Sequence, residues 1–167
     1  MSPTVPAAGK PRLCRNRASL IVCPHRGPGG WLEDLIARLA DPATTIAVVG
    51  ATDAPGKFGG RIYRDLKAKG FRVFAVNPGR DAVDGDRCYG SLAALPEAPT
   101  IVDIVVPPAA ALGVLNECAA LGLERVWLQP GSESAEVLAL AAAHGLAFVA
   151  GDCIMVRARP LPSVRHA

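Results

Sequence analysis

Five short apolar runs, each separated from the next by a segment long enough for a helix, most constrain how this chain can fold. The runs lie at residues 44–49, 71–76, 101–106, 125–128 and 146–150. Near-continuous apolar and β-branched runs are typical of strands buried on both faces. Helical spacing of apolar residues is found at 31–40, 60–69, 109–121 and 136–144. This alternation predicts an α/β fold with a doubly wound, five-stranded parallel sheet in the order 3-2-1-4-5.

Charge is distributed unevenly along the chain. The sequence contains 18 basic and 15 acidic residues, for a net charge of +3. Residues 1–30 hold five basic and no acidic residues and 157–167 hold three basic and no acidic residues, so 31–156 have a net charge of −5. We predict a folded domain at 31–156, a disordered basic extension at 1–30 and a basic C-terminal tail at 157–167. An acidic folded part argues against nucleic acid as a partner.

The cysteines and the length of the apolar runs indicate in which cellular compartment the protein is expected. The five cysteines include no C-x-x-C pair, which favours reduced thiols over a disulfide framework or a metal site. No apolar run approaches the roughly 18–20 residues that a spanning helix needs, so no membrane association is expected. We predict a cytoplasmic protein without a bound metal.

The loop after the first predicted strand is rich in glycine. It reads GATDAPGKFGG over residues 50–60. Glycines let the backbone approach a ligand closely, and the start of the next helix directs N–H groups toward an anion. Ligands of doubly wound sheets bind beyond the carboxyl ends of the strands where the strand order reverses, here predicted between the first and fourth strands. The loop therefore predicts a phosphate site, although it could also serve only as a tight turn.

Two nucleotide-binding motifs fit this loop incompletely. A Walker A motif has four residues between its first glycine and its Gly-Lys pair, whereas five residues separate Gly50 from Gly56. A dinucleotide fingerprint needs glycine where Thr52 stands and an acidic residue near Asn77, at the end of the second strand. An NAD(P)-linked oxidoreductase or redox sensor using the same crevice is thus an alternative that lacks these motif residues.

The other predicted strands end in rigid, uncharged turns. These are Asn77-Pro78-Gly79, Val106-Pro107-Pro108 and Gln129-Pro130-Gly131. Such turns offer main-chain polar groups and suit a long, mostly neutral ligand arm that crosses the edge of the sheet. Lys57 precedes a helix and is the better candidate for a phosphate contact. The arginines that could add positive charge, or could form only a solvated helix face, are Arg61, Arg64 and Arg80.

Several of these segments together resemble one protein family. They are Val48-Val49-Gly50-Ala51-Thr52, Pro55-Gly56-Lys57-Phe58-Gly59, Val76-Asn77-Pro78 and Gln129-Pro130-Gly131. They resemble the CoA-binding domain family, whose Rossmann-like members are related to the N-terminal domain of the succinyl-CoA synthetase α subunit and to ADP-forming acyl-CoA synthetases. The resemblance covers residues 31–156.

The resemblance implies coenzyme A or an acyl-CoA as the ligand. Its nucleotide and pyrophosphate would lie near the ends of the first two strands, and its pantetheine arm would cross the ends of the third and fourth. The implied contacts are Gly50, Ala51, Thr52, Lys57, Phe58, Gly59, Asn77, Pro78, Val106, Pro107, Gln129 and Gly131. The ligases also carry a phosphorylated histidine in a further domain, which nothing after residue 156 matches. A partial acyl-CoA ligase subunit that needs a partner is therefore a second alternative.

No catalytic constellation emerges from the sequence, and we predict binding without catalysis or with an undefined activity. His144 is the only histidine of 31–156. It stands at the end of a predicted helix, where a cationic side chain interacts favourably with the helix dipole, and this role is sufficient to explain it. Asp103 lies within a predicted strand and is expected to be a buried carboxylate with a capping or a loop-holding role. Cys153 follows the fifth strand, where it could form a mixed disulfide with CoA or simply be buried as a small hydrophobic side chain.

Overall fold

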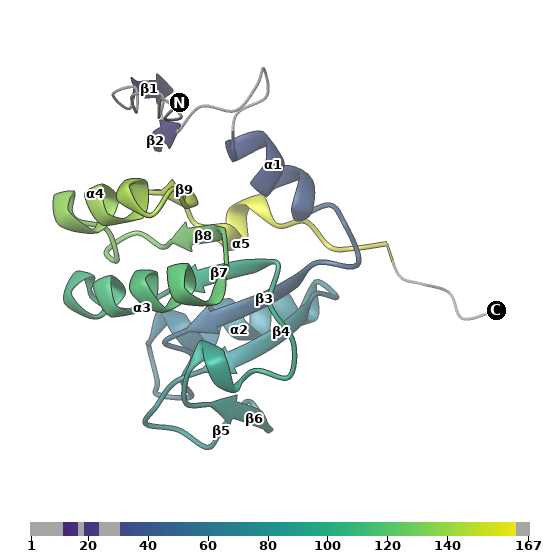
Figure 1. Cartoon of the computed structure of the whole chain (residues 1–167). Helices are drawn as coiled ribbons and strands as arrows, with labels where there is room; N and C mark the ends of the chain where they lie inside the picture. The colour runs from purple at the N-terminus through teal and green to yellow at the C-terminus, as the bar shows by residue number, and fades with distance from the viewer. Residues whose placement is uncertain (1–11, 17–18, 24–30, 163–167) are drawn as a thin grey trace, which may run out of the picture.

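The computed structural model of the chain describes residues 12–16, 19–23 and 31–162. Its strands are β1 (Arg12–Asn16), β2 (Ser19–Cys23), β3 (Thr45–Val49), β4 (Arg72–Val76), β5 (Ala82–Val83), β6 (Asp86–Tyr89), β7 (Ile101–Ile104), β8 (Arg125–Leu128) and β9 (Ala147–Ala150). Its helices are α1 (Trp31–Arg38), α2 (Phe58–Ala68), α3 (Pro108–Leu121), α4 (Ala135–Ala143) and α5 (Ile154–Arg157), with a short 3-10 helix at Leu92–Ala94. The described strands form one mixed sheet in the order β1-β2-β9-β8-β7-β3-β4-β6-β5 (Figure 1).

The five strands predicted from the sequence are all present and parallel to one another, but the predicted five-stranded parallel sheet is wrong: further strands make the sheet mixed, and the order of the five differs from the predicted one. They are β3, β4, β7, β8 and β9, and they lie side by side as β4-β3-β7-β8-β9. In chain order this is 2-1-3-4-5 instead of 3-2-1-4-5. The point where the order reverses therefore lies between β3 and β7, the first and third predicted strands, and not between the first and fourth.

The segment at 80–90 explains this difference. It forms the hairpin β5–β6 around Asp84 and Gly85, both of which have positive φ, as in the two-residue turns that Asp-Gly pairs favour. Strand β6 then pairs with the outer side of β4, with Ala75 opposite Cys88. Because that place is taken, β7 pairs with the other side of β3.

Helices cover both faces of the sheet, as predicted. Helices α3 and α4 pack on one face, and α1, α2 and α5 pack on the other (Figure 1). All five residues of β3 are buried, which explains its uninterrupted apolar sequence. No helix among the described residues has the length and the apolar character needed to cross a bilayer.

The structure describes parts of both segments that flank the predicted domain. Residues 1–30 include the antiparallel pair β1–β2, which the sequence analysis did not predict, and β2 meets β9 at Leu20 and Ala150. The rest of that predicted extension, and residues 163–167 of the predicted tail, lie outside the described residues. The described start of the tail packs on α2, because the N–H of Leu161 donates to the Lys69 carbonyl at 2.8 Å.

Candidate functional site

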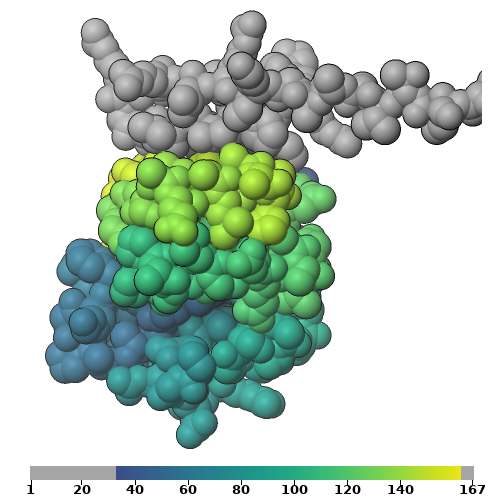
Figure 2. Space-filling view, turned by 60° about the vertical axis from the view of Figure 1, so that its left-hand side comes forward, coloured from purple at the N-terminus to yellow at the C-terminus, as the bar shows by residue number. Residues whose placement is uncertain are grey.

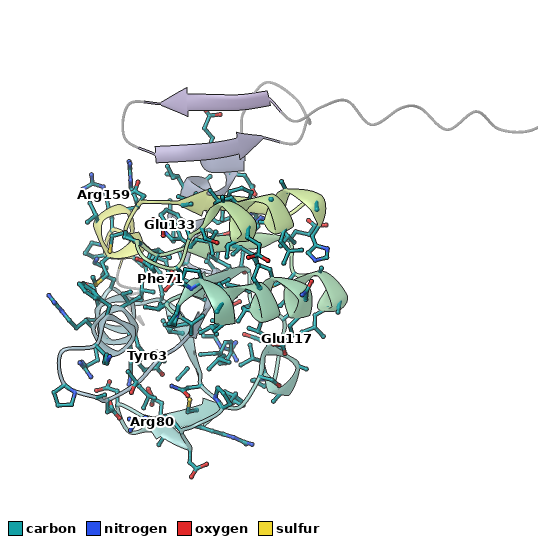
Figure 3. All side chains as sticks on the ribbon, turned by 90° about the vertical axis from the view of Figure 1, so that its left-hand side faces the viewer. Tyr63, Phe71, Arg80, Glu117, Glu133 and Arg159 are labelled. Atoms are coloured by element: carbon teal, nitrogen blue, oxygen red, sulfur yellow. The ribbon has the colours of Figure 1, made fainter. Side chains whose placement is uncertain are left out.

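A cleft of about 470 Å³ lies at the carboxyl edge of the sheet, over the point where the strand order reverses. Figure 2 shows the surface hollowed between the blue residues of α2 and the green residues of α3. Figure 3 views this edge, with Arg80 of the loop after β4 and Glu133 of the loop after β8 on either side of it. The cleft is lined by Gly50, Thr52, Lys57, Phe58, Gly59, Asn77, Val105, Val106, Pro107, Pro130, Gly131 and Ser132.

Glycines bring the first turn of α2 against the loop that follows β3. Gly50 has φ +96°, and a Cβ placed on it would lie 2.9 Å from the Val105 carbonyl oxygen. A Cβ on Gly59 would overlap the carbonyl oxygen of Gly50. Both positions therefore need glycine for close packing of the backbone. As a result, the N-terminal end of α2, where N–H groups carry a partial positive charge, is placed at the cleft.

Lys57 lines this end of the cleft, and two further cations lie next to its lining residues: the Arg61 guanidinium lies over the Phe58 ring, and the Arg80 N–H donates to the Asn77 carbonyl. Lys57, Arg61 and Arg80 are exposed, and in the described part of the chain none of them forms an ion pair. Arg64, by contrast, pairs with Asp53 at 3.5 Å. The cations that remain available suit a ligand with several negative charges.

An aromatic side chain at the start of α2 is unusually exposed. Phe58 lines the cleft and is 59% exposed, and the Arg61 guanidinium lies 5.3 Å from the centre of its ring. An exposed aromatic ring with a stacked guanidinium offers a flat surface on which a planar group of a ligand could lie.

Asn77 joins the ends of β3 and β4. Its Nδ2 donates to the Ala51 carbonyl oxygen at 2.9 Å, and its Oδ1 accepts from the Gly79 N–H at 2.9 Å. Ala51 is fully buried and neither it nor Pro78 lines the cleft. Of these predicted contacts, Asn77 borders the cleft, and Ala51 holds the Asn77 side chain in place through its carbonyl oxygen.

Gln129 is a predicted contact that the structure buries. It is 3% exposed, it does not line the cleft, and its Nε2 donates to Asp103 Oδ1 at 2.6 Å. Asp103 is fully buried, and burial raises the pKa of its carboxyl to about 7 although the hydrogen bond from Gln129 lowers it. The expected loop-holding carboxylate is therefore found at the base of the loop after β8.

Nine of the twelve predicted contacts line the cleft; Ala51, Pro78 and Gln129 do not. Three lining residues were not predicted from the sequence, Val105, Pro130 and Ser132, although each adjoins a predicted contact in the segment after a strand. Glu133 was also missed, and its Oε2 accepts from the Gly131 N–H at 2.8 Å. Cys153 is half-buried and away from the cleft lining.

Other candidate groups lie apart from the cleft. The His144 Nε2 is 2.8 Å from Asn116 Oδ1 of α3, in keeping with a role at the end of α4. Within 12–16, 19–23 and 31–162, no group of three His, Cys, Asp or Glu side chains is arranged to hold a metal ion.

Known proteins of the same fold and sequence pattern include both short and long chains. A conserved hypothetical protein of Pyrococcus furiosus is 41% identical with a TM-score of 0.65, and the match covers 68% of this chain and 97% of that one. A solved protein of Thermus thermophilus is 35% identical with a TM-score of 0.67, over 75% of this chain and 94% of that one.

An ADP-forming acetate–CoA ligase (II) of Archaeoglobus fulgidus is 32% identical over 114 residues, which are 61% of this chain and 17% of the ligase. This chain spans only 13–26% of the length of the acetate–CoA ligases that it matches. The family model described as CoA binding domain matches residues 44–159, which contain every residue that lines the cleft. The chain belongs to the CoA binding domain family.

Proposed function

We propose that the cleft binds coenzyme A or an acyl-CoA. The observation that carries this proposal is a cleft at the reversal point of the sheet that is lined by Lys57. Arg61 lies over the ring of the lining residue Phe58, and the Arg80 N–H donates to the carbonyl of the lining residue Asn77. None of these three cations has an ion-pair partner among the described residues. The family membership supports the same ligand. Named relatives of greater length are acetate–CoA ligases, which act on CoA.

The nucleotide half of the ligand would lie over the loop after β3 and the start of α2. The N–H groups at the start of a helix and the side chain of Lys57 favour a pyrophosphate there. Arg80 follows Asn77 in the loop after β4, to which it is tied by a 3.2 Å hydrogen bond from its N–H to the Asn77 carbonyl. It can supply a further cation for a phosphate at the edge of the cleft.

The pantetheine arm would lie across the ends of β7 and β8. The lining there is Val105, Val106, Pro107, Pro130 and Gly131, which combines apolar side chains with main-chain polar groups. A long neutral arm with amide groups fits this surface. None of these five lining residues is basic, so this part of the cleft offers no cation to a further phosphate group of a ligand.

Titration calorimetry with CoA, acetyl-CoA, NAD and NADP tests the proposal. We expect binding of CoA or acetyl-CoA and at least tenfold weaker binding of NAD and NADP, because the side chain of Asn77 is engaged with backbone groups and offers no carboxylate to a ribose. Binding of NAD or NADP without binding of CoA would overturn the proposal and favour the oxidoreductase alternative. Turnover only after addition of a ligase partner subunit would favour the partial-ligase alternative.

A further inference from the structure

A buried pair of polar side chains connects the two strands that form one wall of the cleft. Asp103 of β7 accepts a hydrogen bond from Gln129, which follows β8, and both residues are buried. Val105 lies two residues after Asp103, and Pro130 lies directly after Gln129; both line the cleft. The pair therefore helps to set the separation of the two chain segments that form this wall.

The surroundings of Asp103 disfavour its ionised form. Side chains alternate along β7, and Ile101 packs in the core beneath α1, α2 and α5, so Asp103 faces the same core. Val48 of β3 and Trp127 of β8 occupy the register positions on either side of it. The second oxygen, Oδ2, is buried without a hydrogen-bond partner among the described residues. A charge in such a place is costly because one hydrogen bond does not compensate for lost hydration.

The other ionisable groups of this core do not offset that charge. Burial raises the pKa values of Tyr63 on α2 and Cys88 on β6, so both stay neutral near pH 7. Two carboxylates at the covering helices are already in ion pairs: Asp34 of α1 pairs with Arg125, and Asp152 beside α5 pairs with Arg157. The pKa of Asp103 is raised by burial and lowered by Gln129, with no charged side chain contributing.

We propose that Asp103 is a positioning residue of the ligand cleft: its neutral carboxyl, hydrogen-bonded to Gln129, keeps the ends of β7 and β8 in the arrangement that binds ligand, and ionisation weakens binding. An ionised Asp103 is stabilised by water, and water reaches it only if the two strand ends part. The wall formed by Val105 and Pro130 then changes shape. This inference rests on the proposed function, because CoA is the ligand used to test it.

The Asp103→Asn variant removes the ability to ionise while it preserves the shape of the side chain. Asparagine keeps an acceptor oxygen for Gln129 but cannot ionise. Calorimetry measures the affinity for CoA at about pH 6 and about pH 8.5. Between these values the affinity of the wild type should weaken roughly three- to tenfold more than the affinity of the variant, because ligand and proton binding are linked. The phosphate monoester of CoA titrates near pH 6 in both experiments and cancels in the comparison.

Glu124→Gln is the matched control. Glu124 is an exposed carboxylate just before β8, at the opposite end of that strand from the cleft. This variant should follow the wild-type pH profile. Parallel profiles for wild type and Asp103→Asn would overturn the inference, whereas the absence of CoA binding at every pH would instead contradict the proposed function.

A measurement on the wild type alone covers the case in which Asp103→Asn does not fold. Calorimetry at about pH 7 in buffers of different ionisation enthalpy reports the protons taken up on binding. Dephospho-CoA is the probe, because it lacks the phosphate monoester. We expect uptake of a fraction of one proton, and the absence of uptake would contradict the inference.

Discussion

Gly59 is the residue at which the backbone is packed most closely around the cleft. A methyl group there would overlap the Gly50 carbonyl oxygen, so we expect Gly59→Ala to destabilise the protein by about 3 kcal/mol. Gly113 of α3 is the control: nothing lies within 4 Å of a Cβ at that position, and Gly113→Ala should be stabilising by roughly 0.5–1 kcal/mol. Urea unfolding of the two variants measures both effects. Equal effects of the two substitutions would contradict close packing at Gly59.

Asp103 makes a second residue-level prediction, on stability instead of binding. Its folded pKa of about 7 lies above its ordinary value of 3.8, so the folded state holds the proton more tightly than the unfolded state. Its contribution to stability is therefore greatest below about pH 4, falls between about pH 4 and 7, and is fully lost above the folded pKa. From about pH 5 to pH 8 the wild type should lose roughly 2–3 kcal/mol that Asp103→Asn does not lose. Denaturant titrations at the two pH values measure this difference, and an unchanged pH dependence in the variant would show that Asp103 ionises normally.

Arg80 allows a test of charge at the cleft under the proposed function. Arg80→Gln should weaken CoA binding roughly three- to tenfold, because an exposed charge-assisted contact contributes on the order of 1 kcal/mol. The loss should shrink as salt is added, since exposed charges are screened. Arg72→Gln is the control, because Arg72 is exposed at the opposite end of β4 and pairs with Glu97 at 3.1 Å. A similar loss in both variants would indicate a general charge effect.

The residues of the cleft could be predicted where their role depends on the main chain. Gly50, Gly59 and Pro107 line it as expected. Glycine permits a positive φ and close contact between backbone segments, whereas proline fixes φ, so these residue types indicate backbone geometry in the sequence itself. Gln129 could not be placed, because its hydrogen-bond partner Asp103 lies on a different strand and 26 residues away in the sequence. Spacing along the chain carries no signal for such a pair.

Helix α4 depends on the side chain that precedes it. The Ser134 Oγ accepts from the Val137 N–H at 3.2 Å, so Ser134→Ala should cost about 1 kcal/mol. Ser91 precedes the 3-10 helix in the same extended conformation but forms no such bond, and Ser91→Ala should leave stability within about 0.5 kcal/mol. Thermal unfolding of both variants measures the difference. A loss in Ser91→Ala as large as in Ser134→Ala would contradict the assigned cap.

The elements were easier to predict than their arrangement. The five parallel strands could be predicted because each is largely apolar, and β3, β7 and β9 are buried along their whole length. Strands β5 and β6 have only two and four residues, of which only Val83 and Cys88 are buried, so the hydrophobic pattern does not reveal them. The Asp84-Gly85 pair is a turn signal that could have revealed the hairpin. Without the hairpin, the sequence gives no reason for β7 to leave the β4 side of the sheet.

Ligand binding should be visible in the stability of the whole molecule under the proposed function. A ligand that binds only the folded state adds about 2.7 kcal/mol at a concentration 100 times its Kd, which for a chain of 167 residues raises the Tm by roughly 5–11 °C. Scanning calorimetry with CoA measures this shift, with NAD at the same concentration as the control. An equal shift with both ligands would favour a site that recognises only their common ADP portion.

The net charge of the folded part must be considered together with where the cations lie. Residues 31–156 have a net charge of −5, so the overall field of the domain repels a polyanion. Lys57 lines the cleft, Arg61 lies over the lining residue Phe58, and Arg80 is hydrogen-bonded to the lining residue Asn77. Recognition of a phosphorylated ligand would therefore depend on this local group and on the start of α2.

The contact between the first turn of α2 and the loop after β3 also has a kinetic consequence. Because backbone atoms of Gly59 and Gly50 touch without intervening side chains, the amide groups of this loop are already in position in the free protein. A ligand then needs to order little of the chain as it enters, and the loss of conformational entropy on binding is small. Association would be governed by the rate of encounter and dissociation by the quality of the contacts, so that relatives with different lining residues should differ mainly in residence time.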